Sequence, residues 1–70
     1  MKDWKRIVGA NVRDLRNAED ISQEKLAFKS KIDLTYMGGI ERGKRNPSLL
    51  VLVRIAKALK VQPADLLKPR

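Results

Sequence analysis

The side chains that offer the most chemistry in this 70-residue sequence are its lysines and arginines. Sixteen of them stand against eight aspartates and glutamates, which gives a formal net charge of +8 at pH 7. Such an excess attracts polyanions, because each phosphate that the protein neutralises releases condensed counterions. A solvated basic surface that keeps the protein soluble explains the charge equally well, and attraction to an anionic membrane surface is a third explanation.

Catalytic and metal-binding chemistry finds little support in the sequence. Histidine, the commonest general base and metal ligand, does not occur. Cysteine does not occur either, which excludes disulfides and thiolate metal sites. Acidic residues are scattered without a paired arrangement, as in Asp3, Asp14, Glu19 and Asp20. We therefore predict that the chain is not an enzyme and uses no metal, cofactor or small-molecule ligand.

Length and composition indicate the kind of fold that positions the charges. Seventy residues suffice for one domain, which we expect to span residues 1–70. Hydrophobic residues make up 43% of the chain but include only three aromatics, so the core must be aliphatic. The longest apolar run covers residues 49–53, far below the roughly 20 residues that span a bilayer. No membrane association is predicted, and we expect a cytoplasmic location.

Apolar residues recur at helical spacing along the chain and predict an all-α fold of five short helices. The expected ranges are 2–18, 23–29, 34–42, 49–59 and 63–67. Ser22, Asp33 and Ser48 each precede a helix and can cap its free N–H groups. Gly43 is a natural end for the third helix, and Pro63 suits the first position of the last one.

Only about four residues, 30–33, join the second predicted helix to the third. Two helices linked so tightly usually cross at a steep angle. In a helix-turn-helix, the second helix of such a pair enters the DNA major groove while the first crosses the backbone. Other small helical bundles also contain tight turns, so the pattern by itself leaves both interpretations open. In either case Leu26, Ala27, Met37 and Ile40 are expected in the core.

Three segments share residue order and spacing with a known family. They read ISQEKLA at 21–27, IERGKRNPSL at 40–49 and IAKALKV at 55–61. Together they resemble the phage Cro/repressor-type (XRE-like) helix-turn-helix family, and residues 35–43 resemble the controller proteins of restriction-modification systems. The resemblance implies a compact five-helix, lambda-repressor-like domain. It also implies a sequence-specific transcriptional regulator that binds double-stranded DNA as a homodimer, with helix 34–42 in the major groove of a palindromic operator.

The resemblance also implies roles for individual residues. Gln23 matches a position that holds a DNA phosphate at the start of the second helix. Arg42, Lys44 and Arg45 follow the third helix, where the family meets the sugar-phosphate backbone. The positions that match the groove-facing set are Asp33, Leu34, Thr35, Tyr36 and Gly39. Glu41 and Arg16 match a pair that ties the third helix to the first.

The chain departs from the family pattern at the centre of this segment. Lys31 stands where glycine is common, so a non-glycine residue would hold a left-handed conformation; we include Lys31 among the predicted DNA contacts. Leu34 replaces a residue that is frequently polar, although it can pack on a thymine methyl group. Gly38 and Gly39 leave one turn of the helix without side chains. Close approach of the backbone to DNA and neutral drift explain this pair equally well.

Helix 49–59 is apolar on most of its surface, which is unusual for a helix with one buried face. A stripe of Leu49, Leu52, Ile55, Ala56 and Leu59 is expected to face the core. The remaining apolar residues predict an isologous homodimer interface formed by Leu50, Val51, Leu66 and Leu67. Coverage of the same residues by the last helix of the same chain is the alternative. A protein-interaction module of this fold, antitoxin- or coactivator-like, is the alternative function.

Overall fold

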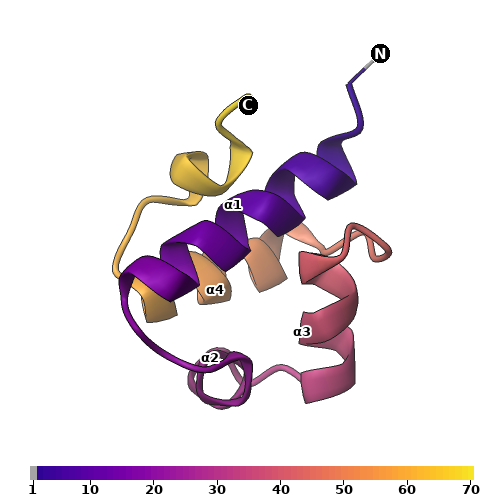
Figure 1. Cartoon of the computed structure of the whole chain (residues 1–70). Coiled ribbons are helices and arrows are strands. Elements are labelled where there is room, and N and C mark those ends of the chain that lie inside the picture. The colour runs from indigo at the N-terminus through magenta and orange to yellow at the C-terminus, as the bar shows by residue number, and fades with distance from the viewer. Residues whose placement is uncertain (1) are drawn as a thin grey trace.

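A computed structural model describes residues 2–70 and confirms the all-helical fold class (Figure 1). The elements are α1 (Trp4–Ala18), α2 (Gln23–Ser30), α3 (Leu34–Glu41), α4 (Leu49–Leu59) and a final short helix, η1 (Pro63–Leu67). The described residues form no strand. The fifth predicted helix is present, but η1 is a 3-10 helix rather than an α-helix. Among residues 2–70, no helix has the length and apolar character needed to cross a membrane.

Side-chain caps fix where the helices begin. Ser22 Oγ accepts a hydrogen bond from the backbone N–H of Lys25 at 3.0 Å, and Ser48 Oγ accepts one from Val51 at 3.2 Å. Each bond satisfies one of the four N–H groups that lack a partner within the first helical turn. The predicted caps are therefore confirmed. The start predicted for α1 was two residues early, because the helix begins at Trp4 and Asp3 caps it.

Left-handed residues end the helices. Gly43 has φ +74°, as expected after α3. Lys31 has φ 57° and ψ 46°, which confirms that a lysine adopts the conformation that glycine often supplies. The side chain of Arg54 donates hydrogen bonds to the carbonyl oxygens of Ser30 at 3.0 Å and Lys31 at 3.3 Å. Arg54 therefore ties the end of α2 to α4 and supports the strained turn.

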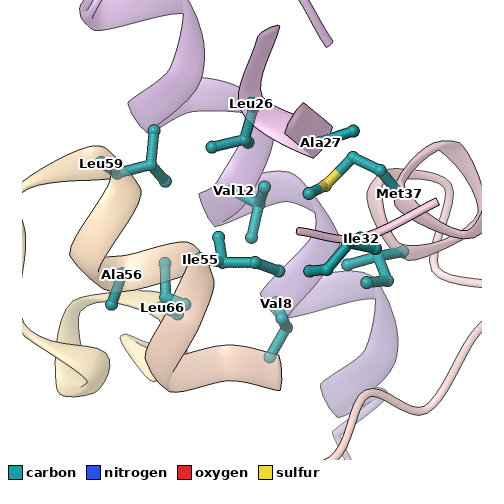
Figure 2. Packing of buried hydrophobic residues seen from close by; sticks show 11 residues of the cluster. Val8, Val12, Leu26, Ala27, Ile32, Met37, Ile55, Ala56, Leu59 and Leu66 are labelled. Carbon is teal, nitrogen blue, oxygen red and sulfur yellow. The ribbon is translucent and has the colours of Figure 1, made fainter. Parts of the chain in front are cut away.

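The core is an aliphatic cluster at the centre of the helices, which Figure 2 shows around Val12, Ile55 and Leu26. Met37 and Ile40 bring α3 into this cluster, as predicted, and both are fully buried. Two predictions about apolar residues are wrong. Leu49 was expected in the core but is 71% exposed, whereas Leu66 was expected at an interface but is fully buried. Leu66 is buried because η1 packs on α1 and α4 and inserts this side chain between them.

Asn11 of α1 anchors the end of the chain. Its buried amide nitrogen donates hydrogen bonds to the carbonyl oxygens of Leu66 and Lys68, both at 2.9 Å. Its amide oxygen accepts a hydrogen bond from the guanidinium of Arg70 at 2.9 Å. Buried polar groups are costly unless they are paired, so these bonds specify where η1 docks. The docking of η1 is what buries Leu66 and completes the core.

A close approach at Gly9 sets the position of α3 against α1. A Cβ atom at Gly9 would lie 2.3 Å from the backbone oxygen of Ile40 and 2.8 Å from that of Glu41. Glycine within a helix costs about 1 kcal/mol relative to alanine. Glycine is needed at this position in spite of that cost, because any side chain at Gly9 would push α3 away from α1.

Candidate nucleic-acid interface

Helices α2 and α3 form a two-helix unit around the turn at Lys31–Asp33. In Figure 1 α2 is viewed along its axis while α3 runs lengthwise beside it, so the two cross steeply, as predicted. The backbone N–H of Ile32 donates to the carbonyl oxygen of Ala27 at 2.9 Å, and the Ile32 side chain is buried. A backbone hydrogen bond and the burial of the Ile32 side chain in the core therefore both fix the turn.

The exposed side chains of α3 lie in its first turn. Leu34 and Thr35 are exposed and Tyr36 is half-buried, whereas the residues from Met37 to Glu41 are buried. The exposed Lys31 lies just before this turn. In helix-turn-helix proteins the N-terminal residues of the second helix contact the base edges. The residues predicted to read DNA thus lie together at the end of α3 that such a binding mode requires.

Asp33, another predicted groove-facing residue, has a structural role in the free protein. Its carboxylate accepts a hydrogen bond from the backbone N–H of Tyr36 at 3.1 Å and caps α3. A carboxylate at a helix N-terminus is also stabilised by the positive end of the helix dipole. The exposed Asp33 therefore fixes the start of α3 and the position of Thr35 and Tyr36 beside it.

Arg45 lies over the outer surface of α3. The carbon at the centre of its guanidinium is 5.8 Å from the centre of the Tyr36 ring, within range of a cation–π interaction. Gly39 is buried beneath the same side chain, since a Cβ atom there would lie 2.7 Å from Arg45 Cγ. Arg45 therefore covers Gly39 in the free protein, and contact of Gly39 with DNA stays a prediction. The missing side chain makes room for Arg45.

A buried carboxylate joins α1, α2 and α3. The side chain of Glu41 is 1% exposed and accepts hydrogen bonds from Arg16 Nε at 2.7 Å and Arg16 Nη2 at 3.0 Å. Gln23 Nε2 donates to the same carboxylate at 3.1 Å. The hydrogen bond to Glu41 raises the pKa of Arg16 above its ordinary value, so the guanidinium stays charged. The predicted pairing of Glu41 with Arg16 is confirmed, and Gln23 is an additional partner that the sequence did not reveal.

Gln23 and Arg42 meet over Gly38. A Cβ atom at Gly38 would lie 3.3 Å from the Gln23 side-chain oxygen and 3.1 Å from Arg42 Nη1. The start of α2 and the end of α3 therefore present one polar and one cationic side chain together, next to the free N–H groups of α2. Lys44, like Arg42, is exposed in the segment that follows α3. This arrangement can bind a phosphate through a helix N-terminus and adjacent cations.

The structure brings Gln23 close to Arg42 and Tyr36 close to Arg45, and it also adds cations that the sequence pattern did not single out. Arg13 of α1 lies 3.8 Å from the Glu41 carboxylate, and Arg6 packs against Gly43. Their spacing of seven residues within one predicted helix was the signal that could have found them, since it puts both on one face. Among residues 2–70, no group of three acidic, histidine or cysteine side chains could hold a metal ion.

Sequence comparison identifies relatives of the whole domain. A helix-turn-helix family model matches residues 12–66. Control protein C.BamHI of Bacillus amyloliquefaciens is 50% identical over 62 residues, which cover 87% of this chain and 76% of the relative. Control protein C.SmaI of Serratia marcescens is 45% identical over 65 residues, covering 93% of this chain and 77% of the relative.

Solved structures agree with this relationship. The restriction-modification controller protein C.AhdI from Aeromonas hydrophila superimposes with a TM-score of 0.86 at 45% identity, over 89% of this chain and 94% of that one. The hypothetical transcription factor NHTF from Neisseria gives a TM-score of 0.91 at 31% identity, over 99% of this chain and 82% of that one. This chain is similar in sequence and fold to these controller proteins. It therefore belongs to the helix-turn-helix family of transcriptional regulators.

Proposed function

We propose that this protein is a sequence-specific regulator that places the first turn of α3 in the major groove of double-stranded DNA. The observation that carries this proposal is the distribution of exposure along α3. Leu34, Thr35 and Tyr36 are accessible at its N-terminal end, and the rest of the helix is buried. Thr35 can hydrogen-bond a base edge, Leu34 can pack on a thymine methyl group, and the Tyr36 hydroxyl can reach a phosphate.

Polar and cationic side chains around α3, which can contact phosphates, support the same orientation. Gln23 and Arg42 flank the N-terminus of α2, while Lys31, Lys44 and Arg45 are exposed around α3. Phosphate contacts fix the register of a protein on the duplex, and base contacts specify the sequence. With DNA as its target and without catalytic groups, the domain acts by binding rather than by chemistry, and we expect it in the cytoplasm.

A homodimer completes the proposed function. Leu49 and Leu50 are 71% and 70% exposed at the start of α4, and Val53 follows one turn later at 40%. Leu67 is 42% exposed on η1, which packs on α4. Val51, which we also predicted at the interface, is half-buried against the core and contributes at its edge. Three of the seven exposed large apolar side chains of residues 2–70 lie on α4. Neighbouring exposed apolar side chains are typical of an interface between proteins, and a two-fold dimer matches a palindromic operator.

The similarity to control proteins C.BamHI and C.SmaI supports a narrower role, namely control of the genes of a restriction-modification system. Selection of bound sequences from a random duplex pool tests the central proposal. We expect enrichment of a palindrome whose half-sites are about one helical turn, or ~10 base pairs, apart. Absence of any enriched sequence would overturn the proposal and favour the protein-interaction module.

Two variants connect the enriched sequence to α3. Thr35→Ala removes an exposed hydroxyl, and Tyr36→Phe removes the phenol oxygen while it keeps the half-buried ring. We expect the double variant to lose much of its preference for the enriched site over random duplex, with an unchanged helical circular dichroism spectrum. Lys25→Ala, an exposed change on α2 outside the residues proposed to contact the bases, is the control and retains the preference. Full discrimination by the double variant would show that another surface reads the bases.

A further inference from the structure

A cationic groove lies between α1 and the segment that joins α3 to α4. The groove has a volume of about 580 Å³, and its cationic lining residues are Arg6, Arg13, Arg42, Lys44 and Arg70. The carboxylates of Asp14 and Glu41 also line it. Five positive charges against two negative ones leave an excess of three, so the groove repels cations and attracts anions.

Both carboxylates of the groove are already paired. Asp14 Oδ2 lies 2.7 Å from Arg70 Nη1, and the Glu41 carboxylate accepts hydrogen bonds from Arg16 and Gln23. By contrast, Arg6, Arg42 and Lys44 form no ion pair within residues 2–70. The weak contact of Arg13 with Glu41, at 3.8 Å, leaves the Arg13 side chain 54% exposed. At least four cations of the groove are therefore available to an external anion.

The spacing of residues on α1 makes the groove open and continuous. Arg6, Ala10 and Arg13 are separated by four and three residues, which aligns them on one face of the helix. Ala10 places a small side chain between the two arginines and leaves space above it. Gly43 rests directly on Arg6, since a Cβ atom there would lie 2.8 Å from Arg6 Cγ. The segment after α3 is thus fixed against the cationic face of α1.

The groove is contiguous with the surface proposed to bind DNA. Arg42 lines the groove and also approaches Gly38 beside Gln23 at the start of α2. Glu41 likewise lines the groove and accepts the hydrogen bond from Gln23. A linear polyanion that passes the N-terminus of α2 can therefore continue along Arg42 to Arg13, Arg6 and Lys44.

We propose that this groove binds the sugar-phosphate backbone of DNA beyond the base pairs that α3 reads, with Arg6 and Arg13 of α1 as phosphate ligands. The proposal rests on the proposed DNA-binding function and extends its footprint. Phosphate contacts of this kind carry no sequence information, but they add affinity and salt dependence. Arg6 and Arg13 therefore strengthen binding to any duplex long enough to fill the groove, without changing the preferred sequence.

The test compares two double variants with equal charge. Arg6→Gln with Arg13→Gln removes two groove cations, whereas Lys57→Gln with Lys60→Gln removes two exposed cations at the end of α4 that is remote from the groove. The slope of log affinity against log salt falls by about 0.9 for each phosphate that the protein no longer neutralises. Each protomer of the proposed homodimer loses two groove cations, so we expect this slope to be smaller by about 3.6 for the groove variant, with at least tenfold weaker binding at low salt, and to change far less for the control.

Two further measurements keep the outcomes distinct. Hydroxyl-radical footprinting of the groove variant should show no protection at outer sugars of the site, while selection from the duplex pool should return the wild-type sequence. A slope equal to that of the α4 control, with an intact footprint, would overturn the proposal. That result is expected if the groove binds an acidic protein and not DNA. If the wild-type protein enriches no sequence, the proposed function fails independently of the groove. Because Arg6 and Arg13 are exposed, both variants should retain the wild-type melting temperature.

Discussion

The guanidinium of Arg45 lies 5.8 Å from the centre of the Tyr36 ring, and Gly39 lies beneath the path of the arginine side chain. Arg45 follows α3 in the chain but returns over the helix because Gly39 has no side chain. The consequence is that a residue expected at the flanking backbone lies against the helix proposed to enter the groove. Gly39 therefore makes room for the side chain of Arg45 on the surface of α3.

Gly39→Ala should separate stability from recognition. The new methyl group would lie 2.7 Å from Arg45 Cγ, so the flexible arginine must leave the surface of α3. Alanine favours a helix over glycine by about 1 kcal/mol, and we expect the melting temperature to rise slightly. Affinity for the selected DNA site should fall several-fold, as measured by titration of labelled duplex.

A double-mutant cycle provides the control for this prediction. Arg45→Ala alone should weaken binding, and Gly39→Ala should have no further effect on affinity in that background, because the displaced side chain is already absent. Additive losses from the two changes would mean that the methyl group disturbs DNA contact directly. In that case Gly39 would be a groove-facing position after all.

Gly9→Ala should have the opposite effect on stability. Here the methyl group would lie 2.3 Å from the backbone oxygen of Ile40, and a backbone atom cannot move aside as an arginine can. We expect a loss of about 2 to 3 kcal/mol in the free energy of unfolding, the upper part of the range for overpacked cores. Urea denaturation checks this value. A variant as stable as the wild type would show that α1 and α3 separate easily, contrary to the close crossing.

Local chemistry made much of the fold predictable. Ser22, Asp33 and Ser48 cap helices through bonds to residues only three positions away, so nearby sequence determines them. The left-handed conformation of Lys31 was predicted from the family pattern, in which glycine is common at this position. The steep crossing of α2 and α3 followed from the length of the turn between them. The pairing of Glu41 with Arg16 came from a family resemblance rather than from spacing.

Contacts between distant residues were beyond the reach of the same reasoning. Leu49 and Leu66 both lie at apolar helical positions, but the core contains Leu66 and excludes Leu49. The burial of Leu66 depends on where η1 docks, and Asn11 fixes that position through a hydrogen bond across 55 positions. The residues around Asn11 in the sequence do not indicate that its side chain bonds to a residue so far along the chain. For the same reason, the sequence did not show that Arg45 lies over Gly39 or that Arg6 and Arg13 border a groove.

Asp65 should make the free energy of unfolding depend on pH in the acidic range. Its carboxylate accepts a hydrogen bond from the backbone N–H of Gln62 at 2.9 Å and lies 3.3 Å from Lys68 Nζ. The backbone hydrogen bond, followed by the bond to Lys68, lowers the pKa of Asp65 below its ordinary value of 3.8. Stabilisation by this carboxylate is therefore full above that ordinary value and is lost as the pH falls through the lowered pKa.

The matched variant for this acid dependence is Asp65→Asn. We expect it to melt at a lower temperature than the wild type at pH 7, with the difference shrinking as the pH falls below the ordinary pKa of the carboxyl group. Carboxyl chemical shifts followed by NMR should show that Asp65 titrates below its ordinary value of 3.8. A constant difference between wild type and variant at every pH would show that the charge of Asp65 has no part in docking η1.

The buried pair of Glu41 and Arg16 should be the most sensitive polar contact in the fold. Glu41→Ala removes a carboxylate that is 1% exposed and leaves the 15% exposed guanidinium of Arg16 without its partner. Breaking a buried pair on one side costs about 3 to 5 kcal/mol, and the lower end applies here because Arg16 keeps some solvent contact. Combining Glu41→Leu with Arg16→Met should recover most of this loss, since no charge is then left unpaired. Chemical denaturation of the single and double variants measures the coupling. If the double variant is as unstable as Glu41→Ala, the pair stabilises the domain through packing rather than through its charges.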